Sequence, residues 1–108
     1  MTNIFENIPY QEQKTGNRKL VDEKYLLMMQ IALKPGQSVP EHNANSNVHI
    51  LIVKGDVIAK LNGVENPAKE GSLVPIAFKT SMSIINRSDK EASFLVIKTP
   101  NPSEMAVQ

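Results

Sequence analysis

The sequence predicts an all-β domain built as a sandwich or barrel of antiparallel strands. Turn signals recur at short, even intervals; they are Lys34-Pro35-Gly36, Lys54-Gly55-Asp56, Asn62-Gly63, Glu70-Gly71 and Asn86-Arg87-Ser88-Asp89. Runs of strand length, rich in Val, Ile or Phe, lie between the turns at residues 48–53, 57–61, 73–76, 82–85 and 93–98. Such spacing is typical of antiparallel hairpins and does not fit alternating βαβ units.

Two segments need a decision about their local structure. Residues 25–33 consist mostly of good helix formers, but the segment ends at Pro35-Gly36 and its neighbours are strands, so we predict a strand. The turn Lys54-Gly55-Asp56 is predicted to close a tight hairpin between the runs 48–53 and 57–61.

The length bounds the number of domains. The chain has 108 residues, of which 41% are hydrophobic, enough to bury one core and too few for two. We therefore expect a single domain over residues 1–108, with a core barrel at about 20–99 and an extension at each end. The segment from Thr99 onward is expected to be an exposed terminus with little order.

Composition excludes several classes of function. The chain has twelve Lys and Arg and eleven Asp and Glu. This near-neutral balance does not predict a positively charged surface for nucleic acid or anionic lipid. The absence of cysteine excludes a catalytic thiolate, disulfides and cysteine-ligated metals. Residues 1–10 have no apolar signal-peptide core, and no apolar run approaches the ~20 residues of a membrane span. The expected location is the cytoplasm.

Residues 48–53 are apolar on both faces of the predicted strand. Val48, Ile50 and Ile52 share one face, while His49 lies on the other with Leu51 and Val53. A strand that is apolar on both faces is covered on both, either as an inner strand or at a protomer contact. A purely structural interaction protein that dimerises through this outer face is one function that the pattern allows.

Residue types that carry catalysis are sparse. No G-x-S-x-G elbow, P-loop or G-x-G-x-x-G occurs. The chain has two histidines, His42 and His49, and His49 is assigned to the outer face. His42 is either a structural histidine bonded to its neighbours or a ligand contact. Glu41 precedes it directly and so should point to the opposite face of a strand. The asparagines of residues 43–47 are interpreted as turn formers, or alternatively as ligand-binding amides.

Two stretches resemble the sequence motifs of the cupin superfamily. Residues 36–55 match the pattern G-x5-H-x-H-x3/4-E-x6-G at Gly36, His42 and Gly55. The second pattern, G-x5-P-x-G-x2-H-x3-N, aligns from Gly71 to Asn86 without a gap. The resemblance implies a double-stranded β-helix, or jelly-roll barrel, often found as a homodimer.

The metal ligands that the resemblance implies are mostly replaced. The first ligand position holds His42, but the second holds Ala44, the glutamate position holds Val48 and the last histidine position holds Met82. Zinc and related metals need about three or four protein ligands, so we expect no metal or other cofactor. Were a metal bound, His42 would be a ligand. The barrel mouth is instead predicted to be a ligand pocket lined by His42, Ala44, Val48, Met82 and Ile84.

Three functions follow from this pattern. The leading hypothesis is a metal-free, non-enzymatic barrel that binds an unidentified small molecule, or serves as a sensor or accessory protein. The alternative is a metal-independent isomerase or epimerase that uses His42 as general base, with Lys79 as a possible electrophile. The third is a metal site improvised from His42, His49 and asparagine amides.

Overall fold

The computed structural model describes residues 1–105, which form nine strands and one short helix. Their bounds, in chain order, are β1 Gly16–Glu23, β2 Leu26–Leu33, β3 Ser38–Asn43, β4 Val48–Lys54, β5 Asp56–Leu61, β6 Val64–Lys69, β7 Leu73–Ile76, β8 Ser81–Ile85, β9 Ala92–Lys98 and α1 Pro102–Met105. Strands lie over all five predicted runs, and β2 confirms the strand predicted at residues 25–33.

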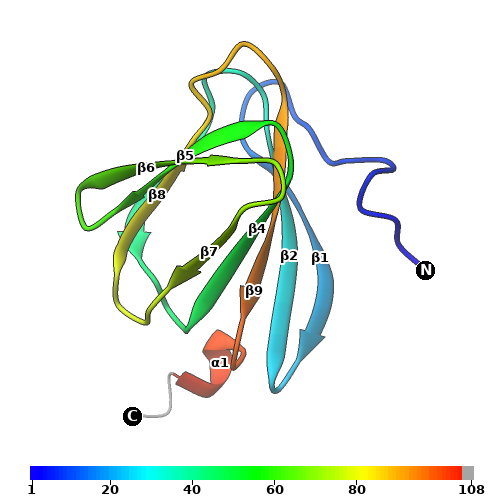
Figure 1. The fold of residues 1–108 in the computed structure, drawn as a ribbon. Coiled ribbons are helices and arrows are strands. Elements are labelled where there is room, and N and C mark those ends of the chain that lie inside the picture. Colours follow the sequence, from blue (N-terminus) through cyan, green and yellow to red (C-terminus); the bar gives the residue numbers. More distant parts are fainter. Residues whose placement is uncertain (106–108) are drawn as a thin grey trace.

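The strands form two facing antiparallel sheets (Figure 1). The five-stranded sheet has the order β1-β2-β9-β4-β7, and the four-stranded sheet has the order β3-β8-β5-β6. Consecutive strands therefore alternate between the sheets from β2 to β5 and again from β6 to β9, with the β5–β6 hairpin between the two series, as in a double-stranded β-helix. The prediction of an all-β jelly-roll barrel is confirmed.

The core lies between the two sheets and follows the alternation of the strands. In β4, Val48, Ile50 and Ile52 are buried against the opposite sheet, whereas His49 is exposed on the outer face. Phe94 of β9 is 1% exposed and is the largest side chain fully buried in this core. The assignment of faces made from the sequence is therefore confirmed for β4.

The predicted hairpin at residues 54–56 is wrong. β4 pairs with β7 and β9, whereas β5 pairs with β6 and β8 in the other sheet. Gly55 forms the corner between the sheets with a φ of 79°. A tight turn signal thus marks a change of sheet here, because a left-handed residue can redirect a strand as well as reverse it.

Both ends of the chain are more ordered than expected. The carboxyl-terminal segment beyond Thr99 continues into α1, Asn101 is buried, and Ser46 donates a hydrogen bond to the carbonyl of Pro100. At the other end, β1 begins at Gly16, ahead of the expected residue 20. The expectation of an exposed, little-ordered tail from Thr99 is wrong up to Met105; the rest of that tail lies outside the described residues.

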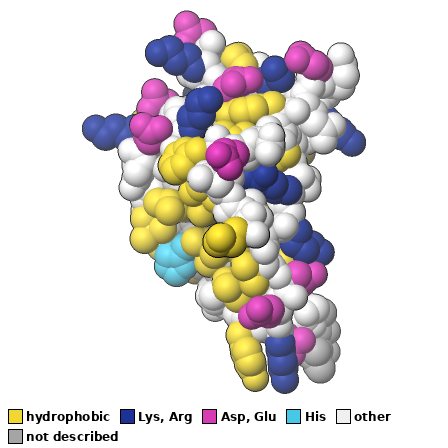
Figure 2. Space-filling model, turned by 90° about the vertical axis from the view of Figure 1, so that its right-hand side faces the viewer, with side chains coloured by type: hydrophobic (Ala, Val, Ile, Leu, Met, Phe, Trp, Pro, Cys, Tyr) yellow, Lys and Arg dark blue, Asp and Glu magenta, His cyan; other side chains and the backbone are white. Residues whose placement is uncertain are grey.

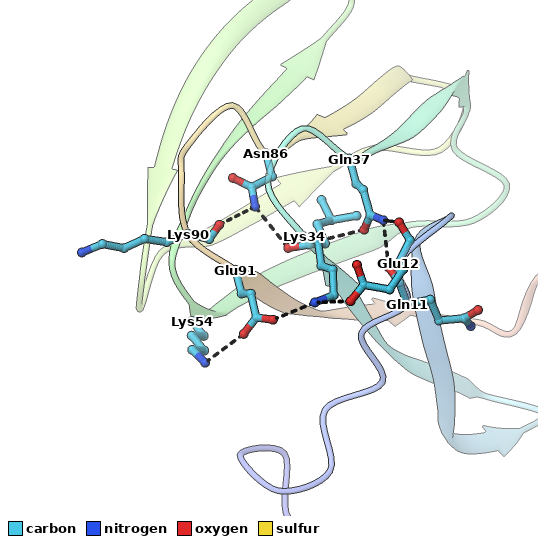
Figure 3. Close-up of polar contacts among 9 residues, drawn as sticks. Gln11, Glu12, Lys34, Gln37, Lys54, Asn86, Lys90 and Glu91 are labelled. Atoms are coloured by element: carbon cyan, nitrogen blue, oxygen red, sulfur yellow. Dashed lines mark hydrogen bonds and ion pairs between the residues drawn. The ribbon is translucent and has the colours of Figure 1, made fainter.

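A polar cluster ties the amino-terminal segment to one end of the barrel (Figure 3). Lys34 forms ion pairs with Glu12 and with Glu91, at 3.1 and 3.4 Å. Gln37 donates from Nε2 to the carbonyl of Gln11, at 2.9 Å. The last residue of β4 and the first residue of β9 lie at this end of the barrel. The mouth of the barrel can therefore lie at the opposite end of these strands.

No helix among residues 1–105 is long and apolar enough to cross a membrane.

Candidate functional site

A cavity of about 170 Å³ lies between the two sheets, at the end of the barrel away from the polar cluster. The structure brings all five residues predicted for the pocket to its wall, namely His42, Ala44, Val48, Met82 and Ile84. The remaining lining residues are mostly apolar; they are Met29, Ile31, Val39, Asn45, Ile50, Phe94, Val96 and Lys98. The cavity is therefore an apolar chamber with a few polar groups.

Strand pairing places these residues side by side. His42 of β3 lies directly opposite Met82 of β8, so the first and last ligand positions of the two motifs are cross-strand neighbours. The loop after β3 is fixed to β8 by backbone hydrogen bonds between Ala44 and residues 79 and 80, each 2.8 Å long. Ala44, Val48 and Met82 are buried, whereas His42 is exposed, which places it at the mouth of the cavity.

The imidazole of His42 has a defined tautomer. Its Nδ1 lies 2.9 Å from the carbonyl oxygen of Pro40, and a carbonyl only accepts, so Nδ1 carries the proton. Nε2 makes no hydrogen bond within residues 1–105, so the imidazole keeps a polar atom available for a ligand. Glu41 is exposed and does not line the cavity, as strand alternation predicts.

His49 lies outside the cavity. It is exposed on the outer face of β4, where it is paired with Ile97 of β9 and Pro75 of β7. Lys79, the possible electrophile, is exposed and is likewise absent from the cavity lining. The structure therefore does not assemble the improvised metal set of His42 and His49, nor the pair of His42 and Lys79.

Lys98 is a cavity residue that the sequence reasoning missed, whereas Asn45 belongs to the asparagine cluster for which ligand-binding amides were the alternative interpretation. The Lys98 ammonium donates a 2.9 Å hydrogen bond to Oδ1 of Asn45, and burial lowers the pKa of this ammonium. Lys98 lies on the same face of β9 as Phe94 and Val96, because side chains two residues apart point the same way. Extending this alternation to the end of the run 93–98 would have found it.

The side chains present do not fit a metal ion. Of the four ligand positions that the motifs imply, only His42 offers a donor, since Ala44, Val48 and Met82 provide none of the usual nitrogen or carboxylate ligands. Residues 1–105 contain no group of three or more His, Cys, Asp or Glu side chains placed to hold a metal. A single imidazole cannot hold a divalent ion against water.

A larger hollow of about 400 Å³ lies over β5 and β6, with Asp56, Lys69 and Arg87 among its lining residues. Arg87 is bound there by both carboxylate oxygens of Glu65, and Asp56 is paired with Lys69 across the strands. Its charged groups thus have neighbours of opposite sign, which makes it a weaker candidate site than the cavity at the barrel mouth.

Comparison with known proteins identifies relatives of the whole barrel. No family profile matches the chain. An uncharacterised protein of Methanocaldococcus jannaschii is 34% identical over 88 residues, which cover 81% of this chain and 76% of that protein. Its crystal structure, described as an RmlC-like cupin family protein with a double-stranded β-helix fold, superposes with a TM-score of 0.80 over 95% of this chain and 98% of that one, at 28% identity.

Other solved structures share the fold. A Thermus thermophilus protein superposes with a TM-score of 0.85 at 19% identity, covering 93% of this chain and 96% of that chain. A predicted oxalate decarboxylase of Thermotoga maritima has a TM-score of 0.73 at 25% identity and covers 80% of each chain. The motif glycines, the strand order and the archaeal relative agree with one another, and we conclude that this chain belongs to the cupin superfamily.

Proposed function

We propose that this cupin is a metal-free binding protein that takes a small molecule into the cavity at the barrel mouth without transforming it. The observation that carries this proposal is the cavity of about 170 Å³, apolar in its depth and ringed by His42, Asn45 and Lys98. An apolar chamber with a few convergent polar groups is the usual composition of a small-molecule site. With its ligand bound, this protein would act as a sensor or as an accessory subunit.

The cavity is poor in groups that move protons. Among its lining residues the titratable side chains are His42 and Lys98 alone. General acid–base catalysis of an isomerisation needs an acid and a base on the reacting atoms, and a carboxylate is the usual partner of a histidine in that role. Glu41, the carboxylate nearest in sequence, lies outside the lining.

The test is a titration of the protein with small aromatic and branched aliphatic molecules, followed in its amide NMR spectrum. We expect shifts confined to residues that line the cavity. Ala44→Met fills the chamber from its wall and should abolish the shifts, while Glu41→Gln, at an exposed neighbour of His42, should keep them. Shifts that persist in Ala44→Met, or probes that leave every cavity residue unmoved, would contradict the proposal.

One observation favours the alternative function of a metal-independent isomerase or epimerase. The hydrogen bond from Nδ1 of His42 to Pro40 leaves Nε2 as a base, and Lys98 supplies a cation in the same cavity that the sequence reasoning did not include. His42→Ala discriminates between the functions. A binder should keep its affinity for apolar probes, whereas an enzyme should lose turnover of its substrate and keep its fold.

The expected homodimer concerns the outer face of the five-stranded sheet. Leu73 of β7 is 59% exposed and lies opposite Leu51 of β4, beside the exposed His49. Figure 2 shows a band of hydrophobic side chains on the side of the molecule that carries β1 and β2. Light scattering of the wild type and of Leu73→Lys tests this prediction: a dimer through this face should become monomeric in the variant, and a monomeric wild type would refute it.

A further inference from the structure

We infer that the molecule bound in the cavity is a small monocarboxylic acid with an apolar body, and that Lys98 binds its carboxylate. This inference rests on the proposed binding function and specifies the chemistry of the ligand. Three observations support it: the position of Lys98, the hydrogen-bond donors left free at the mouth of the cavity, and the volume of the cavity.

The position of Lys98 follows from strand register. Lys98 is paired with Val48 of β4 and with Leu27 of β2, and Val48 is one of the buried cavity residues. The Lys98 side chain is half-buried and lines the cavity together with Val96 and Phe94 of the same strand. Its ammonium group is thus held at the rim of an apolar chamber, because the side chain begins on the inner face of the sheet.

Within the part of the chain that the structure describes, the charge of Lys98 has no protein counter-ion. Across residues 1–105, Lys98 takes part in no ion pair, and its ammonium makes one hydrogen bond, to the neutral amide of Asn45. Two of its three N–H groups are therefore available to a ligand. Burial without a compensating anion also lowers the pKa of this group, so an anion placed here would relieve an existing desolvation cost.

The amide of Asn45, which contacts the Lys98 ammonium, agrees with an acceptor-rich ligand. Because Oδ1 of Asn45 accepts from Lys98, its amide NH₂ group is the part that remains free, and it makes no hydrogen bond within the described residues. The Lys98 ammonium and the Asn45 amide NH₂ group together offer several N–H donors to an incoming group. A carboxylate is the acceptor-only group that suits such a pair, and charge-assisted hydrogen bonds of this kind are about twice as strong as neutral ones.

The size of the chamber limits the apolar body. A dry cavity of roughly 150 Å³ in another protein holds a benzene molecule. The cavity here measures about 170 Å³ and is walled by side chains such as Phe94, Ile84 and Met82. It therefore suits a single aromatic ring or a short branched chain, and it is too small for a sugar nucleotide or a long-chain fatty acid.

Calorimetric and NMR titration with benzoate and with its neutral analogue benzamide tests the inference. We expect benzoate to bind the wild type at least about tenfold more tightly than benzamide, the gain of one charge-assisted contact. Lys98→Met keeps the apolar stem and removes the charge, so it should remove that advantage while leaving benzamide affinity unchanged. Lys54→Met, at the other end of the barrel, is the matched control and should change neither affinity.

The outcomes separate this inference from the proposed function. Equal affinity for benzoate and benzamide in the wild type, or undiminished benzoate binding in Lys98→Met, would overturn the carboxylate assignment and leave the binding function standing. Failure of both compounds to move any cavity resonance at millimolar concentration would overturn both. Thermal melts establish that each variant is folded, and Lys98→Gln serves as a second neutral variant if Lys98→Met does not fold.

Discussion

Arg18 donates two hydrogen bonds to a single oxygen of the buried Gln30, from Nε at 3.0 Å and from Nη2 at 2.7 Å. The amide nitrogen of Gln30 in turn donates to the carbonyl of Ile4 and to the hydroxyl of Ser93. Arg18 also binds the carbonyls of residues 3, 6 and 7. One side chain that is 0% exposed thereby joins β1, β2, β9 and the amino-terminal segment.

Gln30→Leu should lower the free energy of unfolding by roughly 1–3 kcal/mol, since it removes the one side-chain acceptor that Arg18 has among the described residues and leaves the Ile4 carbonyl and the Ser93 hydroxyl without the donor that Gln30 supplies. Urea denaturation measures the loss. Lys19→Gln removes the exposed ion pair between Lys19 and Asp22 on the same strand and should cost no more than about 0.5 kcal/mol. Equal effects of the two substitutions would show that Gln30 does not organise this side of the barrel.

Asn86 is a second buried polar side chain on which the fold depends. Its amide donates to the carbonyls of Leu33 and Lys90, at the end of the barrel that holds the polar cluster (Figure 3). Its Oδ1 accepts from the backbone and hydroxyl of Ser88. Asn86→Ala should therefore cost about 2 kcal/mol or more in the free energy of unfolding. Asn66→Ala, the same change at an exposed position, should cost about 0.5 kcal/mol, and the order of the two losses is the test.

Gly55 occupies a position that no side chain fits. A Cβ added there would lie 2.5 Å from the carbonyl oxygen of Glu91, and the residue has a φ of 79°. Gly63 has a similar φ of 82° but nothing within 4 Å of the same point. Gly63→Ala should cost about 1–2 kcal/mol of backbone strain. Gly55→Ala should cost a further 1–3 kcal/mol or so, because its Cβ clashes with the carbonyl of Glu91.

Tyr10 predicts a pH dependence. Its hydroxyl is buried with no hydrogen-bond partner among residues 1–105, and burial, followed by the negative charge of Glu91, raises the pKa of the phenol. The folded state thus binds this proton more tightly than the unfolded chain, so the associated stability is present below the ordinary tyrosine pKa and is lost as pH rises through the raised one.

Tyr10→Phe should therefore be at least as stable as the wild type at neutral pH, because it removes an unsatisfied hydroxyl. It should also lose less stability than the wild type above about pH 10. Melting temperatures measured at both pH values test this, with Tyr25→Phe at a side chain that is 74% exposed as the control. A wild type and Tyr10→Phe variant with parallel alkaline profiles would contradict the assignment.

The sequence predicted the inner strands and the edge strand β7, and it missed the other three edge strands. β1, β3 and β6 stand at sheet edges, and their segments carry many polar residues or a proline within the strand. An edge strand forms through backbone hydrogen bonds to its one neighbouring strand, so its own residues need not alternate between apolar and polar. The buried strands β4, β8 and β9 had to be hydrophobic and were therefore visible in the sequence.

The sequence also predicted one part of the candidate site and not another. The motif resemblance brought His42, Ala44, Val48 and Met82 into register, because each position is counted from a glycine whose positive φ fixes a turn. Asn45 and Lys98 belong to no motif position. They come into contact because β9 pairs with β4, which begins shortly after Asn45. Such a contact between residues more than fifty positions apart depends on topology, which spacing alone does not reveal.

The direct cross-strand pairing of His42 with Met82 has a consequence for how such barrels diversify. Asn86 and the ion pairs of Lys34 sit at one end of the strands, and the side chains that line the chamber sit at the other. The chemistry of the chamber can therefore be changed by exchanging a few residues at the mouth, while the polar contacts at the other end stay as they are. A barrel divided in this way is an economical starting point for engineering: new donors introduced at Ala44, Val48 and Met82 would face a histidine that is already in place.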